Sequence, residues 1–448
     1  MTDALRFPKN FVWGVATSAH QFEGGLDDNN WGAWERRGRI HSGERSGLAC
    51  DWWRNAERDF DLAREMGLNA LRLSVEWSRV EPRENEWNDA ALARYREMLE
   101  GLVARGITPW VCLHHFTNPA WFELRGGFED PASPVLFERF ARRVVDALGD
   151  ICRFWVTLNE PNVYAVMGYQ LGEFPPGRRG DTRAFVRVTR NLVRAHAHAY
   201  RALHAARSGL VVGFTQNFFL FEPFVARSPL DRIVSHIPDV AFNQAFVHAL
   251  QTGQLPFPFS ALAKPLRDVQ GTYDFAGYNY YGRFRVTFDA KNPSEFFSRR
   301  FVPEDAPQGD TGHHSPYAEC YPHGIAIFAR RIAAMGKPIY ILENGVPDAR
   351  DRLRPWLIAH AAREMFDLIA AGVDLRGYFH WSLVDNFEWT EGWQLRFGLI
   401  AMDERTQQRT LRNSGRLYGA IARKNALERA DVETWAPSAV AEVFPVPT

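Results

Sequence analysis

The sequence predicts an α/β protein folded as a single (β/α)8 TIM barrel with extended βα loops, one domain that covers residues 1–448. Three observations lead to this fold class. Eight short apolar segments recur along the chain, stretches of helical periodicity separate them, and no linker or low-complexity run divides the chain. Strands and helices in regular alternation build a parallel sheet with right-handed crossovers, and eight such units close it on itself.

The eight apolar segments are rich in Val, Ile, Leu and Phe, and each ends in polar or aromatic residues. Near-continuous apolar runs of this length are typical of strands buried on both faces, as in a parallel sheet. In order along the chain, the predicted strands cover residues 11–17, 68–75, 108–115, 153–160, 210–217, 274–281, 338–344 and 375–383.

The stretches between these segments have the periodicity of helices. In residues 90–104, Leu92, Tyr95, Leu99 and Leu102 follow one another at spacings of three and four, and Gly106 is suited to end the helix. The same periodicity predicts helices over residues 56–66, 134–148, 185–206, 324–334 and 355–371.

Two doubly wound domains are the alternative to one barrel. This alternative is disfavoured because no glycine-rich phosphate loop follows a strand and no linker separates two halves. The absence of that loop also speaks against a bound dinucleotide. Four widely spaced cysteines without a CxxC pair predict neither a disulfide framework nor a zinc site. We therefore expect no cofactor and no metal ion.

Composition excludes several classes of protein. Lys plus Arg and Asp plus Glu each total 53, and zero net charge is untypical of a nucleic-acid binder or a polybasic membrane-surface protein. The longest apolar stretch, residues 210–226, is interrupted by polar residues and by Pro223, so it cannot span a bilayer. The first residues carry no apolar run typical of a signal peptide, and we expect a cytoplasmic protein.

Polar residues gather at the same end of every predicted strand. In a parallel barrel these carboxyl-terminal ends form one face, which is where such barrels carry their chemistry. The sequence therefore predicts one composite site. Its contributing residues are 17–21, 72–74, 114–115, 159–160, 216–217, 279–281, 343–344 and 380–382.

Glu160 and Glu343 each follow a buried apolar strand. A carboxylate in such a place is costly without a partner or a chemical role. Each glutamate taken alone is equally well explained by an ion pair with an arginine such as Arg72. Two of them on one barrel rim favour catalysis, because paired carboxylates that flank an acetal are what glycoside hydrolysis requires.

The two carboxyl groups need different protonation states, one to donate a proton and one to remain ionised. Arg72 and the hydroxyl of Tyr281 would favour the anion of Glu343. Glu160, beside Asn159, would keep its proton into the neutral range. We therefore expect Glu343 to be the nucleophile and Glu160 the acid.

Four longer motifs resemble those of family 1 glycoside hydrolases, the β-glucosidase and β-galactosidase group. Residues 11–24 resemble the amino-terminal signature, 157–161 and 342–345 the two carboxylate motifs, and 378–389 with 396–399 the carboxyl-terminal sugar-binding signature. Shorter motifs also match, and all of the motifs follow the order they have in the family. The resemblance extends from about residue 7 to residue 425.

The resemblance implies a retaining exo-β-glycosidase with a covalent glycosyl-enzyme intermediate on Glu343 and with Glu160 as acid and then base. It implies that Arg72, Asn279 and Tyr281 hold and tune the nucleophile, and that Trp381 forms an apolar platform beneath the sugar ring. The residues implied to bind the hydroxyls of the non-reducing sugar are Gln21, His115, Asn159, Glu388 and Trp389.

The expected substrate is a small-molecule β-glycoside or an oligosaccharide with a non-reducing terminal β-D-glucosyl residue, and galactosyl and fucosyl residues stay open. Glu388 would repel a 6-phosphate on the sugar. A transglycosylase that uses the same intermediate is an open alternative. A non-catalytic sugar-binding protein is disfavoured, because this chain keeps both carboxylates.

Residues 283–323 form a long insertion after the sixth strand that is rich in Phe and Arg. Long loops of this kind usually form functional rims around a barrel site. Many relatives carry a Gly-Trp pair before a Tyr-Pro-x-Gly turn, and residues 315–324 lack that Trp. We therefore expect the departure to alter which leaving group is accepted, while the chemistry stays the same.

Overall fold

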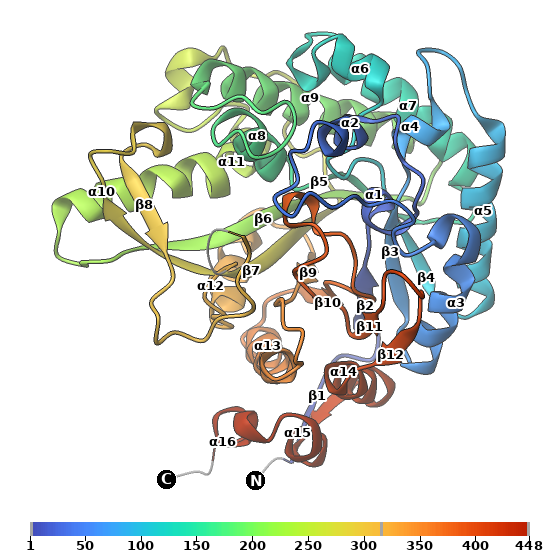
Figure 1. The fold of residues 1–448 in the computed structure, drawn as a ribbon, viewed down its shortest axis with the longest axis vertical. Helices are drawn as coiled ribbons and strands as arrows, with labels where there is room; N and C mark the ends of the chain where they lie inside the picture. Colours follow the sequence, from blue (N-terminus) through green and yellow to red (C-terminus); the bar gives the residue numbers. More distant parts are fainter. Residues whose placement is uncertain (1–2, 314–316, 446–448) are drawn as a thin grey trace.

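Eight parallel strands close into a barrel in the computed structural model, which describes residues 3–313 and 317–445 (Figure 1). Each strand pairs with the next one in the chain, β7 pairs with β9 across an inserted β8, and β10 pairs with β2 to complete the ring. The barrel strands are β2 (Val12–Ala16), β3 (Ala70–Ser74), β4 (Thr108–Cys112), β5 (Phe154–Asn159), β6 (Val211–Pro223), β7 (Phe275–Phe288), β9 (Ile339–Asn344) and β10 (Leu375–His380). The predicted barrel is confirmed.

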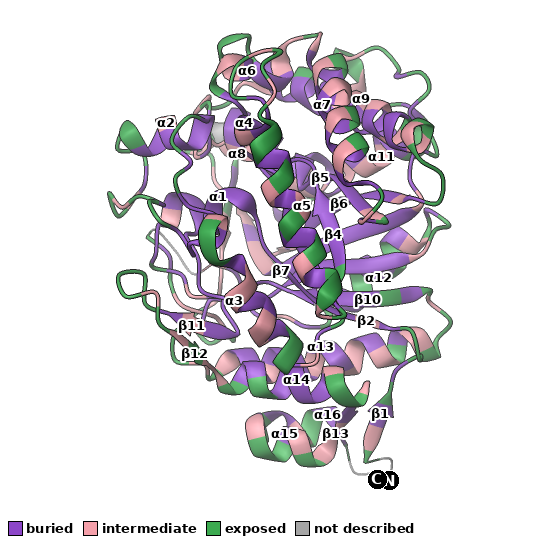
Figure 2. Cartoon of the chain, turned by 90° about the vertical axis from the view of Figure 1, so that its right-hand side faces the viewer, coloured by how far each residue is buried: buried purple, intermediate pink, exposed green. Residues whose placement is uncertain are grey.

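Helices surround the barrel and turn their buried sides toward it (Figure 2). All six predicted helices are present with ends that differ by a few residues, and α14 adds an outer helix after β10. No helix in residues 3–313 and 317–445 combines the length and apolar character that a membrane span needs. The outer helices are α3 (Trp52–Glu65), α5 (Asp89–Ala104), α7 (Ser133–Leu148), α9 (Thr182–Ala206), α12 (Gly324–Ala333), α13 (Leu353–Ala370) and α14 (Asn413–Lys424).

Shorter elements lie in the loops and near the two ends of the chain. Strand β1 (Ala4–Arg6) pairs with β13 (Ala426–Glu428), so the first and last parts of the described chain lie side by side (Figure 1). The others are α1 (Ala19–Phe22), α2 (Asn30–Arg36), α4 (Trp77–Val80), α6 (Ala120–Leu124), η1 (Gly127–Glu129), α8 (Pro161–Tyr169), α10 (Pro229–Pro238), η2 (Asp239–Gln244), α11 (Ala245–Thr252), η3 (Phe259–Leu262), η4 (Pro293–Glu295), β8 (Ser298–Phe301), η5 (Trp389–Glu391), β11 (Ile400–Met402), β12 (Arg409–Leu411), α15 (Arg429–Trp435), η6 (Pro437–Ala439) and α16 (Val440–Val443).

Aromatic rings from five strands fill the inside of the barrel. Trp110 of β4 stacks on Phe154 with 4.3 Å between ring centroids, and it contacts Phe275, Tyr340 and Phe379 at 5.0–5.5 Å. All of these rings are buried or nearly so. Offset and edge-to-face contacts of this kind add to the gain from burying the ring surfaces. The rings form a packed floor beneath the carboxyl ends of the strands.

Strands β6 and β7 extend beyond the predicted strand ends at residues 217 and 281. They stay paired as far as Pro223 and Val286, and β8 adds an antiparallel strand to β7. Aromatic contacts hold this extension together, with Phe221 and Phe284 stacked at 6.3 Å. The inserted segment 283–323 therefore begins as a strand, and its residues 314–316 lie outside the described part of the chain.

Candidate active site

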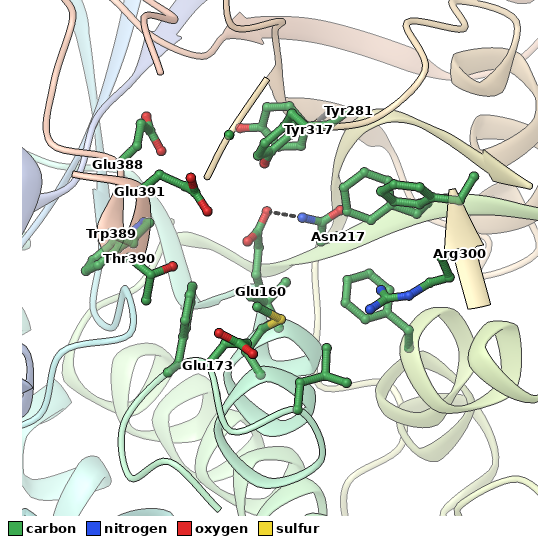
Figure 3. A pocket seen from close by; sticks show the side chains of 18 of the residues that line it. Glu160, Glu173, Asn217, Tyr281, Arg300, Tyr317, Glu388, Trp389, Thr390 and Glu391 are labelled. Atoms are coloured by element: carbon green, nitrogen blue, oxygen red, sulfur yellow. Dashed lines mark hydrogen bonds between the residues drawn. The ribbon is translucent and has the colours of Figure 1, made fainter. Parts of the chain in front are cut away.

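A cavity of about 480 Å³ opens at the carboxyl ends of the barrel strands (Figure 3). Seven of the eleven predicted site residues line it, and the other four are buried side chains that do not line it. In the described part of the chain no group of three His, Cys, Asp or Glu residues could hold a metal ion. The lining residues are Glu160, Glu343, Tyr281, His115, Trp381, Glu388 and Trp389, and the others are Arg72, Asn279, Asn159 and Gln21.

Glu160 stands between the end of β5 and the start of α8. Its backbone adopts a left-handed conformation with φ of 49°, which is strained for a residue with a side chain. The backbone N–H donates to the carbonyl of Thr215 at 2.8 Å. The amides of Asn217 and Asn279 donate to Oε1 of Glu160 at 2.8 and 2.7 Å. Both donors are neutral, and no cation among the described residues is in direct contact with this carboxyl group.

Glu343 lies near the end of β9 and has a different environment. The guanidinium of Arg72, which is fully buried, donates to Oε1 of Glu343. The hydroxyl of Tyr281 donates to Oε2 at 2.5 Å. A buried carboxylate with a cation on one oxygen and a hydroxyl on the other is held in one orientation.

The pKa values of the two glutamates are both raised, but to different extents. Burial and then the negative charge of Glu343 raise the pKa of Glu160 well above its usual value. Burial also raises the pKa of Glu343, while Arg72 and the Tyr281 hydroxyl oppose the increase. When the pair holds one proton, that proton therefore resides on Glu160, as acid catalysis requires.

Asn279 lies between the two carboxyl groups. Besides donating to Glu160, its amide lowers the pKa of Glu343. The sequence predicts that Asn279 holds and tunes the nucleophile, and the structure adds its direct hydrogen bond to Glu160. Asn159 is placed behind them, with Oδ1 accepting from Arg72 at 3.0 Å and Nδ2 lying 3.2 Å from Nε2 of His115.

Aromatic and polar side chains form the wall that faces these carboxyl groups. Nε1 of Trp381 donates to Oε1 of Glu388 at 3.0 Å. The imidazole of His115 stacks against Trp381 and Trp389 with ring centroids 5.9 and 5.8 Å apart. Burial lowers the pKa of His115 well below its usual value and raises that of Glu388 well above. A neutral imidazole and a buried carboxyl group are suited to bind sugar hydroxyls.

Gln21 differs from the other predicted sugar-binding residues. Its Nε2 donates to Oδ1 of Asn386 at 2.9 Å and to the carbonyl of Phe387 at 2.8 Å, and its Oε1 accepts from Ser18 at 2.6 Å. The side chain thus anchors the loop that precedes Glu388. In this structure both of its amide protons point to protein acceptors.

Comparison with known proteins agrees with this geometry. The sequence model described as Glycosyl hydrolase family 1 matches residues 4–427. The chain belongs to glycosyl hydrolase family 1. It is 32% identical over 451 residues to Beta-glucosidase A of Thermotoga maritima, which covers 94% of this chain and 99% of that relative.

Solved structures of family 1 members have the same fold. A beta-glycosidase from Pyrococcus horikoshii superposes with a TM-score of 0.87 at 36% identity, over 96% of this chain and 98% of that chain. A beta-glucosidase from Thermotoga maritima in complex with deoxynojirimycin gives 0.87 at 29% identity, over 95% and 100%. The expectations of family 1 membership, a TIM barrel and a β-glucosidase-type glycoside hydrolase are confirmed.

Two lining residues near the carboxyl groups have no assigned role in the sequence prediction. Asn217, a direct donor to Glu160, was placed in the composite site by its position at the end of a predicted strand, but its contact with Glu160 was not predicted. Tyr317 lies in the insertion, where no periodicity marks it, and its ring meets those of Tyr281 and Phe397 at 5.6 and 5.2 Å. Burial and nearby carboxylates, Glu388 first, raise the pKa of Tyr317 well above its usual value.

Proposed function

We propose that residues 1–448 form one catalytic domain, a retaining exo-β-glycosidase in which Glu343 is the nucleophile and Glu160 the acid and base. The observation that supports these roles is the contrast between the two buried carboxyl groups. Glu343 accepts from a cation and a hydroxyl, whereas the donors to Glu160 in the described part of the chain are neutral amides. Retaining glycosidases need this pair of environments on the two sides of the scissile bond.

In the first step Glu343 attacks the anomeric carbon while Glu160 protonates the glycosidic oxygen. The bond to the leaving group breaks, the aglycone departs as an alcohol, and an ester bond joins the sugar to Glu343. Arg72 and Tyr281 aim the attacking carboxylate through their bonds to its two oxygens. Loss of its proton leaves Glu160 ionised, and the amides of Asn217 and Asn279 stabilise that anion.

In the second step Glu160 acts as the base. It takes a proton from water, the water oxygen attacks the anomeric carbon from the face that the aglycone left, and the ester to Glu343 breaks. Two inversions restore the original configuration of the sugar. Both carboxyl groups return to their starting protonation states.

The proposed substrates are unphosphorylated β-glycosides with a terminal β-D-glucosyl residue. Glu388 and its partner Trp381 lie on the wall where the hydroxyls of the terminal sugar would bind. Family 1 relatives of this chain include Beta-glucosidase A of Thermotoga maritima. The expected location in the cytoplasm stays a prediction from the sequence.

Azide rescue tests the two roles. Glu160→Ala leaves the nucleophile in place, so an activated aryl β-glucoside with azide should give a β-glucosyl azide. Glu343→Ala should lose turnover, and azide should give no product of retained configuration. A β-glucosyl azide from Glu343→Ala and none from Glu160→Ala would reverse the assignment. NMR of the products and of the sugar anomer first released by the unsubstituted enzyme provides the readout.

A further inference from the structure

The active-site cavity continues outward along the extended strands β6, β7 and β8. This outer half is lined by four phenylalanines, by two adjacent arginines and by one glutamate. The proposed catalytic roles place the sugar against Glu160, Trp381 and Glu388, so the outer half is left for the aglycone. The residues of this outer half are Phe219, Phe221, Phe242, Phe284, Arg299, Arg300 and Glu295.

The phenylalanines form one continuous aromatic wall. Phe219 contacts Phe284 and Phe242 at centroid distances of 5.1 and 5.8 Å, and Phe221 stacks on Phe284 at 6.3 Å with 17° between the planes. These rings offer flat carbon surfaces and no hydrogen-bonding group. A sugar bound against them would leave hydroxyls without partners, whereas an aromatic ring would bury its faces at little cost.

Two cations stand beside this wall on β8. The guanidinium of Arg300 lies 5.9 Å from the ring centroid of Phe284 and is paired with Glu295 at 3.2 Å, with a third of its side chain exposed. Arg299 is exposed, and among the described residues no carboxylate lies within ion-pairing distance of it. The outer half thus carries two positive charges against one negative charge.

The inner half of the cavity is rich in carboxyl groups, in contrast to the two arginines of the outer half. Glu160, Glu343, Glu388 and Glu391 all line it. Figure 3 shows Arg300 on one side of Glu160 and the carboxyl groups of Glu388 and Glu391 on the other. A bound molecule therefore lies between a carboxyl-rich end for its sugar and a cationic end for its aglycone. An anionic group on the aglycone is attracted only if it lies far from the glycosidic oxygen.

We propose that the outer half of the cavity selects aryl β-glycosides whose aglycone carries a carboxylate on the far edge of the ring. The ring packs against Phe219 and Phe284, and Arg300 donates hydrogen bonds to the carboxylate, with Arg299 adding its charge. This inference rests on the proposed function, since it assigns the leaving group of that reaction.

The test compares acid and neutral aglycones in matched pairs. The pairs are the 4-carboxyphenyl and 4-carbamoylphenyl β-glucosides, and the longer 4-(2-carboxyvinyl)phenyl glucoside with its carboxamide. For each pair the ratio of kcat/KM, acid over amide, is measured in the unsubstituted enzyme and in Arg300→Gln and Arg299→Gln. Differences in leaving-group reactivity cancel when the ratios are compared between enzymes.

We expect the acid-to-amide ratio to fall about three- to tenfold in Arg300→Gln, less in Arg299→Gln, and to fall with added salt in the unsubstituted enzyme. Arg285→Gln is the matched control. Arg285 lies on the same extension and pairs with Glu222, but it does not line the cavity. The acid-to-amide ratio should therefore be the same in Arg285→Gln as in the unsubstituted enzyme.

Three results would overturn the inference, and the first two concern the acid-to-amide ratio. One is an unchanged ratio for both pairs in both arginine variants, and the other is an equal fall in Arg285→Gln. Faster hydrolysis of cellobiose than of every aryl glucoside would assign the outer half to a sugar instead. Failure of the catalytic proposal looks different, because the neutral carboxamides would then not be hydrolysed at all.

Discussion

The hydrogen bond from Tyr281 to Glu343 can be removed with almost no other change. Tyr281→Phe removes only the hydroxyl group, which donates to Oε2 of Glu343 at 2.5 Å. Both residues are buried. A hydrogen bond to a charged partner contributes about 1.5–3 kcal/mol, and here solvent does not weaken it. If the bond serves to aim the nucleophile, kcat/KM for a β-glucoside should fall roughly ten- to a hundredfold.

The same variant should change the pH dependence in one direction. The hydroxyl of Tyr281 lowers the pKa of Glu343, so its loss raises that pKa further. Because Glu343, the proposed nucleophile, would act as the anion, activity should be lost as pH falls through this pKa, and the acidic limb of kcat/KM should move to higher pH.

Tyr280→Phe is the control for both effects. Tyr280 is the neighbouring residue on β7, and its hydroxyl donates to the carbonyl of Tyr321 at 2.7 Å, outside the cavity. In Tyr280→Phe the acidic limb of kcat/KM should stay at the same pH as in the unsubstituted enzyme. An unmoved limb in Tyr281→Phe, or a limb moved to lower pH, would refute the argument that this hydroxyl stabilises the nucleophile's anion.

Three further predictions follow from the site and the core. Asn217→Ala removes a donor that lowers the pKa of Glu160, so the alkaline limb of kcat/KM should move to higher pH; a limb moved to lower pH would contradict the role of this amide. A 6-phospho-β-glucoside should be hydrolysed about a hundredfold less efficiently than its parent, because its charged phosphate would lose its hydration against the buried carboxyl group of Glu388; equal kcat/KM values would refute this. Trp110→Ala should lower the free energy of unfolding in urea by about 3–5 kcal/mol, and a change below about 1 kcal/mol would show that the floor repacks.

The barrel was predictable because its physical signals are strong. Strands buried on both faces read as apolar runs, and the polar residues that end them mark the face where the cavity lies. Glu160 and Glu343 could be identified for this reason. The same rule placed Asn217, which ends such a run, in the predicted site, although it did not predict the contact with Glu160.

The extension of β6 and β7 was not predictable from those signals. Asn217 looked like the end of a strand, yet the chain stays paired beyond it because Phe221 and Phe284 stack across the two strands. The hydrogen-bond partners of the Gln21 amide could not be predicted from the sequence either. Its partners Asn386 and Phe387 lie more than 360 residues away, and only the closed fold brings them to it.

The aromatic floor around Trp110 leaves one route into and out of the site from the barrel axis. Since packed rings block the barrel axis beneath Glu160 and Glu343, the glycosyl unit enters first and sits at a dead end. The departing alcohol must leave through the mouth before water can arrive by the same route. The free monosaccharide would then leave by the same mouth, and the interior of a sugar chain cannot thread past the blocked end.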